Sequence, residues 1–71
     1  MELVRKDNGT AVLHASLDEL VLMANMANEA IEAVEDWEFS TRLGFDKEVA
    51  RNVARQLAII ADNMLGHSES D

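Results

Sequence analysis

Two segments of this 71-residue chain repeat apolar side chains at helical spacing, and this pattern constrains the fold more than any other feature. At about 100° per residue, the first segment carries a broad apolar stripe: Leu17, Leu20, Val21, Ala24, Ala27, Ile31 and Val34. The second carries a narrower one: Val49, Ala50, Val53, Leu57, Ile60, Ala61 and Met64. Each stripe needs a surface to cover it, so the sequence predicts two long helices packed on each other.

Local motifs mark the ends of these helices. The segment SLDE, residues 16–19, is a capping box, in which the Ser16 hydroxyl accepts from the backbone N–H of Glu19 and the Glu19 carboxylate accepts from that of Ser16. The first helix is therefore expected to begin directly after the serine. The second long helix is expected between Asp46, its cap, and Gly66, which closes it.

The connection DWEFSTRLG, residues 36–44, predicts a short helix between the two long ones. Asp36 can cap its start, and Gly44 can supply the left-handed residue that ends it. Phe39 and Leu43 lie four residues apart and so share one face.

Residues 2–15 predict a β-hairpin, with Asn8-Gly9 in a type I′ turn. This register pairs Val4 with Leu13 and Arg5 with Val12. One face then carries Val4, Ala11, Leu13 and Ala15, and the other carries Leu3, Arg5, Val12 and His14. A lone two-stranded ribbon is marginal in water, so the first face is expected to lie on the helices.

The predicted fold class is α+β and mostly helical, with an N-terminal β-hairpin packed on two longer helices joined by a short helix. Residues 1–66 are expected to form a single small domain and residues 67–71 a disordered tail. The chain has no cysteine, so its stability is expected to come from good helix packing or self-association.

Acidic residues outnumber Lys and Arg by 14 to 6, which gives a net charge of −8. Such a charge repels phosphate backbones and anionic lipid, and it favours a basic protein surface as the partner. No stretch approaches the roughly 20 apolar residues of a membrane span, and the N-terminus lacks the apolar run of a secretory signal. The sequence therefore predicts a cytoplasmic protein that binds neither membranes nor nucleic acid.

The stretch EAIEAVEDWEF, residues 29–39, gathers acids around the only tryptophan of the chain, Trp37. These acids are Glu29, Glu32, Glu35, Asp36 and Glu38. Most of them face away from the apolar stripe, which is typical of a solvated or partner-binding surface. No Glu-x-x-His, second carboxylate helix or calcium loop accompanies them, so neither a metal site nor a cofactor is expected.

The other polar residues indicate no catalytic site. His14 lies in a predicted strand and His67 in the predicted tail, and neither has an obvious base, orienting acid and nucleophile together. No phosphate loop or hydrolase motif is present. An enzyme is therefore not expected.

The first long helix carries a second apolar group outside its main stripe: Leu22, Met23, Met26 and Ala33. These residues either pack under the hairpin or form an exposed patch that dimerises or grips a partner, and flexible methionines suit an adaptable surface. Asn28 falls within the main stripe, where a buried amide must find a hydrogen-bond partner locally or across a dimer.

Lys47, Arg51 and Arg55 form a basic ridge on the second long helix. The ridge either pairs with acids of the first helix or joins them in contacting a partner. The segment STRLGFDKEVARNVARQL, residues 40–57, also has the order of a helix-turn-helix, in which the ridge would contact DNA phosphates. The excess of acids weighs against that interpretation.

The runs LDELVLMANMANEAIEA and DWEFSTRLGFDKEVARNVARQL resemble a group of short bacterial proteins of uncharacterised function. In that group a hairpin precedes an Asn-containing helix and a Trp-Glu-Phe-x-Thr-Arg-Leu-Gly turn. The resemblance covers about residues 12–57 and implies a bacterial or phage origin and a compact α+β domain. It carries over no catalytic or binding residue.

The function predicted from size and charge is stoichiometric protein binding: a small acidic inhibitor, of the immunity or anti-defence type, that occupies a basic surface of a larger bacterial protein. The five acids would steer association, and Trp37, Met23 and Met26 would form the apolar anchor. The alternative is a dimeric helix-turn-helix protein that binds DNA or acts in transcription. A third hypothesis is a structural homodimer formed through Leu22, Met23 and Met26.

Overall fold

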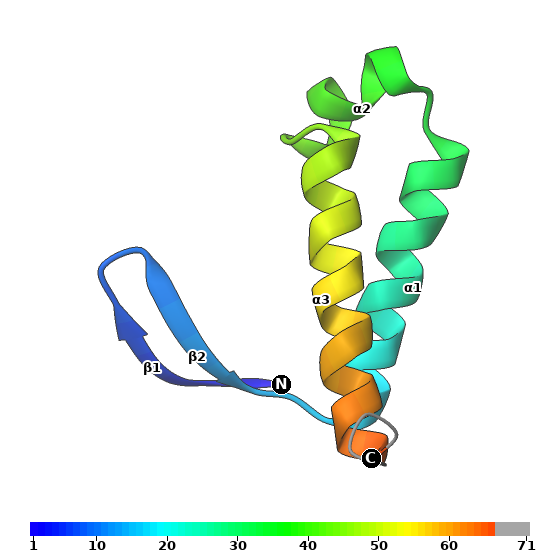
Figure 1. The fold of residues 1–71 in the computed structure, drawn as a ribbon. Helices are drawn as coiled ribbons and strands as arrows, with labels where there is room; N and C mark the ends of the chain where they lie inside the picture. Colours follow the sequence, from blue (N-terminus) through cyan, green and yellow to red (C-terminus); the bar gives the residue numbers. More distant parts are fainter. Residues whose placement is uncertain (67–71) are drawn as a thin grey trace.

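The computed structural model describes residues 1–66 as a β-hairpin followed by three helices (Figure 1). The elements are β1, Glu2–Asp7; β2, Thr10–His14; α1, Leu17–Ala33; α2, Asp36–Leu43; and α3, Lys47–Leu65. The predicted α+β, mostly helical class and the order of its elements are confirmed. The tail predicted for residues 67–71 lies outside the described residues. No helix in residues 1–66 combines the length and apolar character needed to cross a membrane.

Helices α1 and α3 run antiparallel side by side, and α2 crosses one end of the pair (Figure 1). Their contact is made mostly of small side chains, because Ala24 of α1 and both Ala54 and Ala61 of α3 are buried, together with the larger Leu20 of α1. Small residues at a helix contact allow the axes to approach closely. Phe39 of α2, only 2% exposed, is the one large side chain that is fully buried in the described residues. The core is therefore thin.

The predicted helix boundaries are largely confirmed. The Ser16 hydroxyl accepts from the Glu19 N–H at 3.1 Å, and a Glu19 carboxylate oxygen accepts from the Ser16 N–H at 2.8 Å. Asp46 accepts from the first turn of α3. Gly44 and Gly66 end α2 and α3 at φ values of +89° and +82°, which glycine adopts without strain.

The cap predicted for α2 is wrong by one residue. Glu35 is the N-cap and makes no side-chain capping bond, while Asp36 is already the first helical residue. Val34 and Glu35 are both extended, so the chain turns the corner on these two residues. The Asp36 carboxylate is therefore free to contact Lys47 of α3.

The hairpin register is partly as predicted. Arg5 pairs with Val12, but Leu13 pairs with Leu3 and not with Val4, because a bulge lies between Leu3 and Arg5. A bulge adds one residue to one strand and bends it, which alternation in the sequence does not reveal. Every residue of both strands is exposed, and the hairpin projects from the helices (Figure 1). The face predicted to lie on the helices instead turns toward them across a groove.

The apolar stripe of α3 is only partly buried, contrary to expectation. The helix contact is centred on alanines, and Ala54 was absent from the predicted stripe. Val49, Val53 and other large members of the stripe flank this contact and are more than 40% exposed. Asn28, predicted within the buried stripe of α1, is also exposed, so it needs no buried partner.

Candidate protein-binding surfaces

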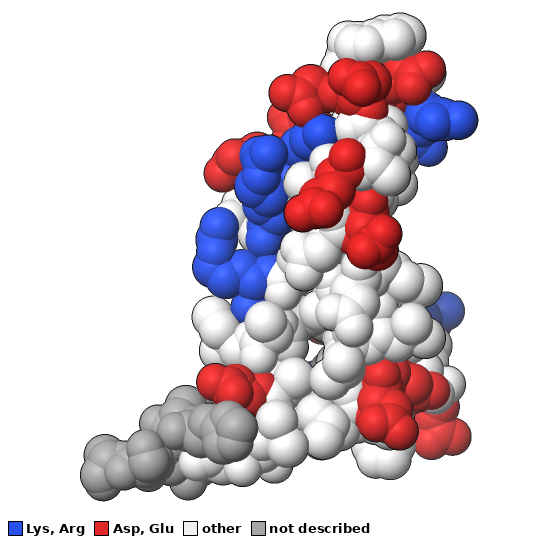
Figure 2. All heavy atoms as spheres, turned by 90° about the vertical axis from the view of Figure 1, so that its right-hand side faces the viewer, with Lys and Arg blue, Asp and Glu red and all other residues white. Residues whose placement is uncertain are grey.

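The predicted acidic residues gather where α1 ends and α2 begins. We define the acidic end as Glu29 and Glu32 of α1, the N-cap Glu35, and Asp36, Trp37 and Glu38 of α2. Figure 2 shows acidic side chains concentrated at this end of the molecule, over the tip of the helical pair. All of these residues are exposed except Glu38, which is half-buried.

Trp37 lies in the first turn of α2 between Asp36 and Glu38 and is 78% exposed, more than any other large apolar residue in residues 1–66. The flanking acids suit this position, because negative charge is favourable at a helix N-terminus. Trp37 itself contributes little to the core. Its indole is therefore presented to solvent between two carboxylates.

Two of the five acids of this end are paired within the molecule. An Asp36 oxygen lies 2.6 Å from the Lys47 ammonium, and a Glu38 oxygen lies 3.7 Å from the Arg42 guanidinium. The hydrogen bond from Lys47 is the main reason that the pKa of Asp36 is lowered. The other three acids, Glu29, Glu32 and Glu35, form no ion pair within residues 1–66. These three carry the uncompensated charge of the acidic end.

The basic ridge does not pair with the acids of α1, contrary to one of the two expectations. Lys47, only 14% exposed in its side chain, contacts Asp36 and lies over the Phe39 ring, 5.7 Å from its centre. Arg51 pairs with Glu48 at 3.8 Å, and Arg55 donates to Asn52 at 2.8 Å. Figure 2 shows Lys and Arg side chains on one flank, beside the acidic side chains.

The structure places the predicted methionine anchors away from Trp37. Met23 precedes the last residue of α1 by ten positions, or about 15 Å along the helix axis. Met23 is half-buried and lines the groove under the hairpin, whereas Leu22 and Met26 are exposed. Met23 thus lies under the hairpin, and dimerisation or partner binding by the exposed Leu22 and Met26 stays a prediction. Of the three anchor candidates, only Trp37 belongs to the acidic end.

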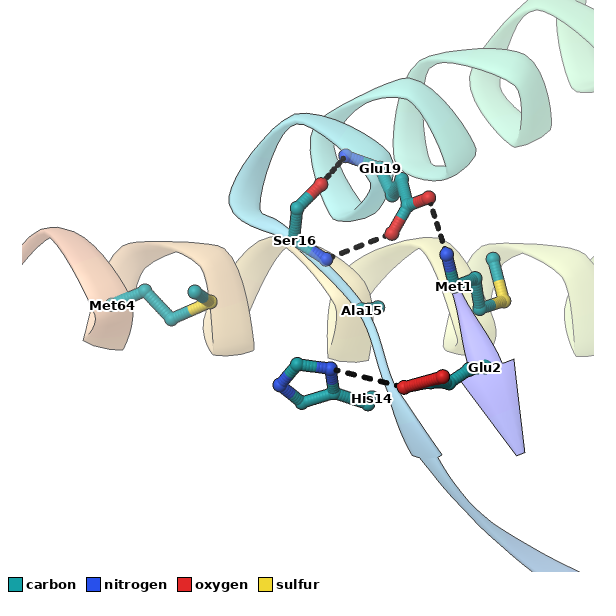
Figure 3. A pocket seen from close by; sticks show the side chains of 7 residues that line it. All are labelled: Met1, Glu2, His14, Ala15, Ser16, Glu19 and Met64. Carbon is teal, nitrogen blue, oxygen red and sulfur yellow. Dashed lines mark hydrogen bonds and ion pairs between the residues drawn. The ribbon is translucent and has the colours of Figure 1, made fainter. Parts of the chain in front are cut away.

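A hollow of about 570 Å³ lies where the hairpin joins α1 (Figure 3). The Met1 amine donates to Glu19 at 2.6 Å, and His14 Nδ1 faces a Glu2 oxygen at 3.9 Å. The hydrogen bond from Met1, followed by that from the Ser16 N–H, lowers the pKa of Glu19. The spacing of residues in the sequence did not predict the contact between the Met1 amine and Glu19. Several polar groups of this exposed hollow pair with one another, and the Ser16 hydroxyl accepts from the Glu19 N–H (Figure 3).

An apolar surface lies between α1 and α3, and the sequence predicted only part of it, including Ala27, Val49 and Val53, as members of the apolar stripes. One groove, of about 220 Å³, lies near Phe45 and is lined on one side by Ala27 and Ala30 and on the other by Val49 and Val53. A second, of about 470 Å³, lies under the hairpin. Val53 lines both, so the two grooves form one continuous surface.

No group of three or more His, Asp or Glu side chains in the described part of the chain is placed to hold a metal ion. The chain matches no protein-family model, no curated protein and no solved structure. These comparisons thus add no support to the resemblance of residues 12–57 to short bacterial proteins. A proposal for function therefore starts from the geometry of the surfaces.

Proposed function

We propose that this chain is a stoichiometric protein-binding module whose acidic end docks on a basic surface of a larger protein and blocks it. The observation that carries the proposal is the position of Trp37, 78% exposed and flanked on α2 by two carboxylates. Tryptophan is among the residues that contribute most to interface affinity when a partner covers it.

The charge of the acidic end supports a role for its carboxylates in attracting the partner. Glu29, Glu32 and Glu35 form no ion pair within residues 1–66, so their field extends into solvent, where it attracts a basic surface. The net charge of −8 adds to this attraction. Complementary charge accelerates association, and the apolar contact of Trp37 then slows dissociation.

The alternative helix-turn-helix function has one feature in its favour. Gly44 adopts the left-handed conformation in the tight connection between α2 and α3, as that motif requires. However, Lys47 is largely buried and bonded to Asp36, so a phosphate would have to compete with an internal carboxylate for it. The geometry therefore favours the protein-binding function.

The first experiment uses the full chain as bait in a lysate of the native host, followed by purification of the captured protein and stopped-flow association kinetics. The double change Glu29→Lys/Glu32→Lys should lower the association rate constant by about tenfold or more and reduce its salt dependence. The matched control is Glu2→Lys/Asp18→Lys, which changes the net charge equally at the other end of α1. Equal effects of the two double changes would contradict the proposal.

A second measurement separates the anchor from the steering charges. Trp37→Ser should raise the dissociation rate constant by about tenfold or more while leaving the association rate constant nearly unchanged. A titration of duplex DNA with the protein at low salt tests the helix-turn-helix alternative. Retardation of DNA that is lost on Arg51→Ala/Arg55→Ala would favour the helix-turn-helix alternative over this proposal.

A further inference from the structure

The surface on the groove side of the α1–α3 pair is apolar and largely uncovered. We define the apolar face by six residues that line its grooves and are between 42% and 65% exposed: Leu43, Phe45, Val49, Val53, Ile60 and Met64. By contrast, only five residues of the described chain are buried, and three of these are alanines. More large apolar side chains thus lie on this face than in the core.

The accessible surface shows how much this arrangement leaves open. The chain exposes 5627 Å², whereas a compact protein of 7.9 kDa exposes about 4,400 Å². The excess is about 1,200 Å². The exposed hairpin contributes to this excess together with the apolar face. A stable protein–protein interface covers about 800 Å² on each partner.

The apolar face carries a hollow and, beside it, large exposed side chains. Beside the ridge of Val49 and Val53 on α3 lies the hollow over Ala27 and Ala30 on α1. In a two-fold symmetric contact, the ridge of one copy faces the hollow of the other, and the reverse contact forms at the same time. Small residues at such a contact allow the helices of the two copies to approach closely.

The charge distribution also points to a second copy. Within residues 1–66, no Asp, Glu, Lys or Arg lines either groove, so two copies can meet there without burying an unpaired charge from this part of the chain. The ion pairs of Lys47 and Arg51 lie on the other flank of α3. A basic partner, which the acidic end attracts, would find no carboxylate on the apolar face.

We propose that a second copy of this chain covers the apolar face and forms a two-fold symmetric dimer. This inference concerns a different surface from the acidic end and does not depend on the proposed function. It also differs from a dimer built on Leu22, Met23 and Met26, since Leu22 and Met26 line neither groove and Met23 lines only the second. The dimer leaves the acidic end of each copy free.

The test is sedimentation equilibrium of the full chain. The wild type should dimerise, and its dissociation constant should fall as NaCl rises from about 50 mM to about 500 mM, because salt screens the repulsion between two chains of charge −8. Binding of a basic partner at the acidic end should weaken over the same range. The sign of the salt effect thus distinguishes the two surfaces.

Val53→Lys should raise the dimer dissociation constant by about tenfold or more, because it places a charge where both grooves meet. The matched control is Ile59→Lys, an exposed residue of α3 that lines neither groove, and it should leave the constant within about threefold. Phe45→Lys, in the turn before α3 and 65% exposed, carries the same test if Val53→Lys does not fold.

A wild-type chain that stays monomeric up to about 100 μM at high salt would overturn the dimer. Equal weakening by Val53→Lys and Ile59→Lys, or no effect of Phe45→Lys, would also overturn the assignment to this face. Trp37→Ser should not change the dissociation constant of the dimer. Loss of partner binding with an intact dimer, or the reverse, shows which of the two proposals has failed.

Discussion

The ammonium nitrogen of Lys47, at the start of α3, lies 2.6 Å from a carboxylate oxygen of Asp36, at the start of α2. The same nitrogen lies 5.7 Å from the centre of the Phe39 ring. Lys47 thus ties the short helix to the long one and covers the one large side chain that is fully buried in residues 1–66. Residues that resemble a phosphate-binding ridge in the sequence serve in part to hold the corner of the fold together.

The first prediction concerns the reactivity of the two lysines. Lys6, in an exposed strand, should react with an amine-acylating reagent at least about threefold faster than Lys47, whose ammonium is hydrogen-bonded and 14% exposed. Asp36→Asn should speed up the modification of Lys47 without changing that of Lys6. Time-resolved mass spectrometry of the peptides measures both rates. Equal rates in the wild type would show that Asp36 does not hold Lys47 in solution.

Two carboxylates should make stability depend on acid pH. The hydrogen bond from Lys47 lowers the pKa of Asp36, and that from the Met1 amine lowers the pKa of Glu19. A carboxyl group whose pKa is lower in the folded state stabilises the fold above its unfolded pKa, and this contribution is lost as pH falls through the folded pKa. The free energy of unfolding should therefore decrease slightly below about pH 4, with little change between about pH 5 and 7.

Urea denaturation over this pH range measures that decrease. The double change Asp36→Asn/Glu19→Gln should make the free energy of unfolding depend less steeply on pH below about pH 4. Glu29→Gln/Glu32→Gln is the matched control, since these acids form no ion pair within the described residues. If both double changes flatten the slope equally, the two contacts contribute nothing specific to the acid response.

The capping box of α1 should contribute measurably to stability. Ser16→Ala removes the hydroxyl that accepts from the Glu19 N–H at 3.1 Å and should lower the free energy of unfolding by about 1 kcal/mol. Ser40→Ala, within α2, is the control and should cost nothing, because alanine has the higher helix propensity. Thermal denaturation followed by circular dichroism compares the two, and an equal loss would contradict the role of the cap.

Phe39 should be the side chain most costly to truncate. Phe39→Ala removes the one large side chain that is fully buried in the described chain and should cost about 3 to 5 kcal/mol, enough to unfold much of so small a protein. Trp37→Ala truncates a larger ring two residues away that is exposed, and it should cost less than about 1 kcal/mol. Urea denaturation followed by circular dichroism measures the free energy of unfolding of both variants. Tryptophan fluorescence is unsuitable, because Trp37→Ala removes the only tryptophan.

The fluorescence of Trp37 should report the charge of the acidic end. Relative to a free, uncharged tryptophan derivative, an exposed indole between Asp36 and Glu38 should show enhanced quenching by caesium ions and reduced quenching by iodide, with neutral acrylamide quenching efficiently. Glu35→Gln/Glu38→Gln should bring both ratios closer to one. A caesium ratio equal to or below the iodide ratio would mean that Trp37 does not lie in a negative field.

The parts of the fold that the sequence predicted are those determined by neighbouring residues. The Ser16 capping box, the Asp46 cap and the terminating glycines each act within a few residues, so their chemistry can be read along the chain. The fold class follows from these boundaries and from the helical spacing of the apolar residues. The turn at Asn8-Gly9 also gave the pairing of Arg5 with Val12.

The errors arise where distant residues decide the outcome. Periodicity ranks side chains by hydrophobicity, so it placed Val49 and Val53 in the core, whereas close contact between the helices selects the smaller Ala54. The bulge at Val4 and the contact of Met1 with Glu19 leave no local signal. For the same reason the acidic end could be located from the sequence, while the apolar face became visible only when α1 and α3 were placed side by side.

The alanine contact between α1 and α3 limits which amino-acid substitutions this protein can tolerate. A larger residue in place of Ala24 or Ala61 would force α1 and α3 apart, and glycine at either position would lower the stability of its helix. Both larger and smaller residues should therefore be destabilising at these positions. Freedom to vary should instead be concentrated on the solvated flank, where residues such as Asn25 can be exchanged without moving either helix.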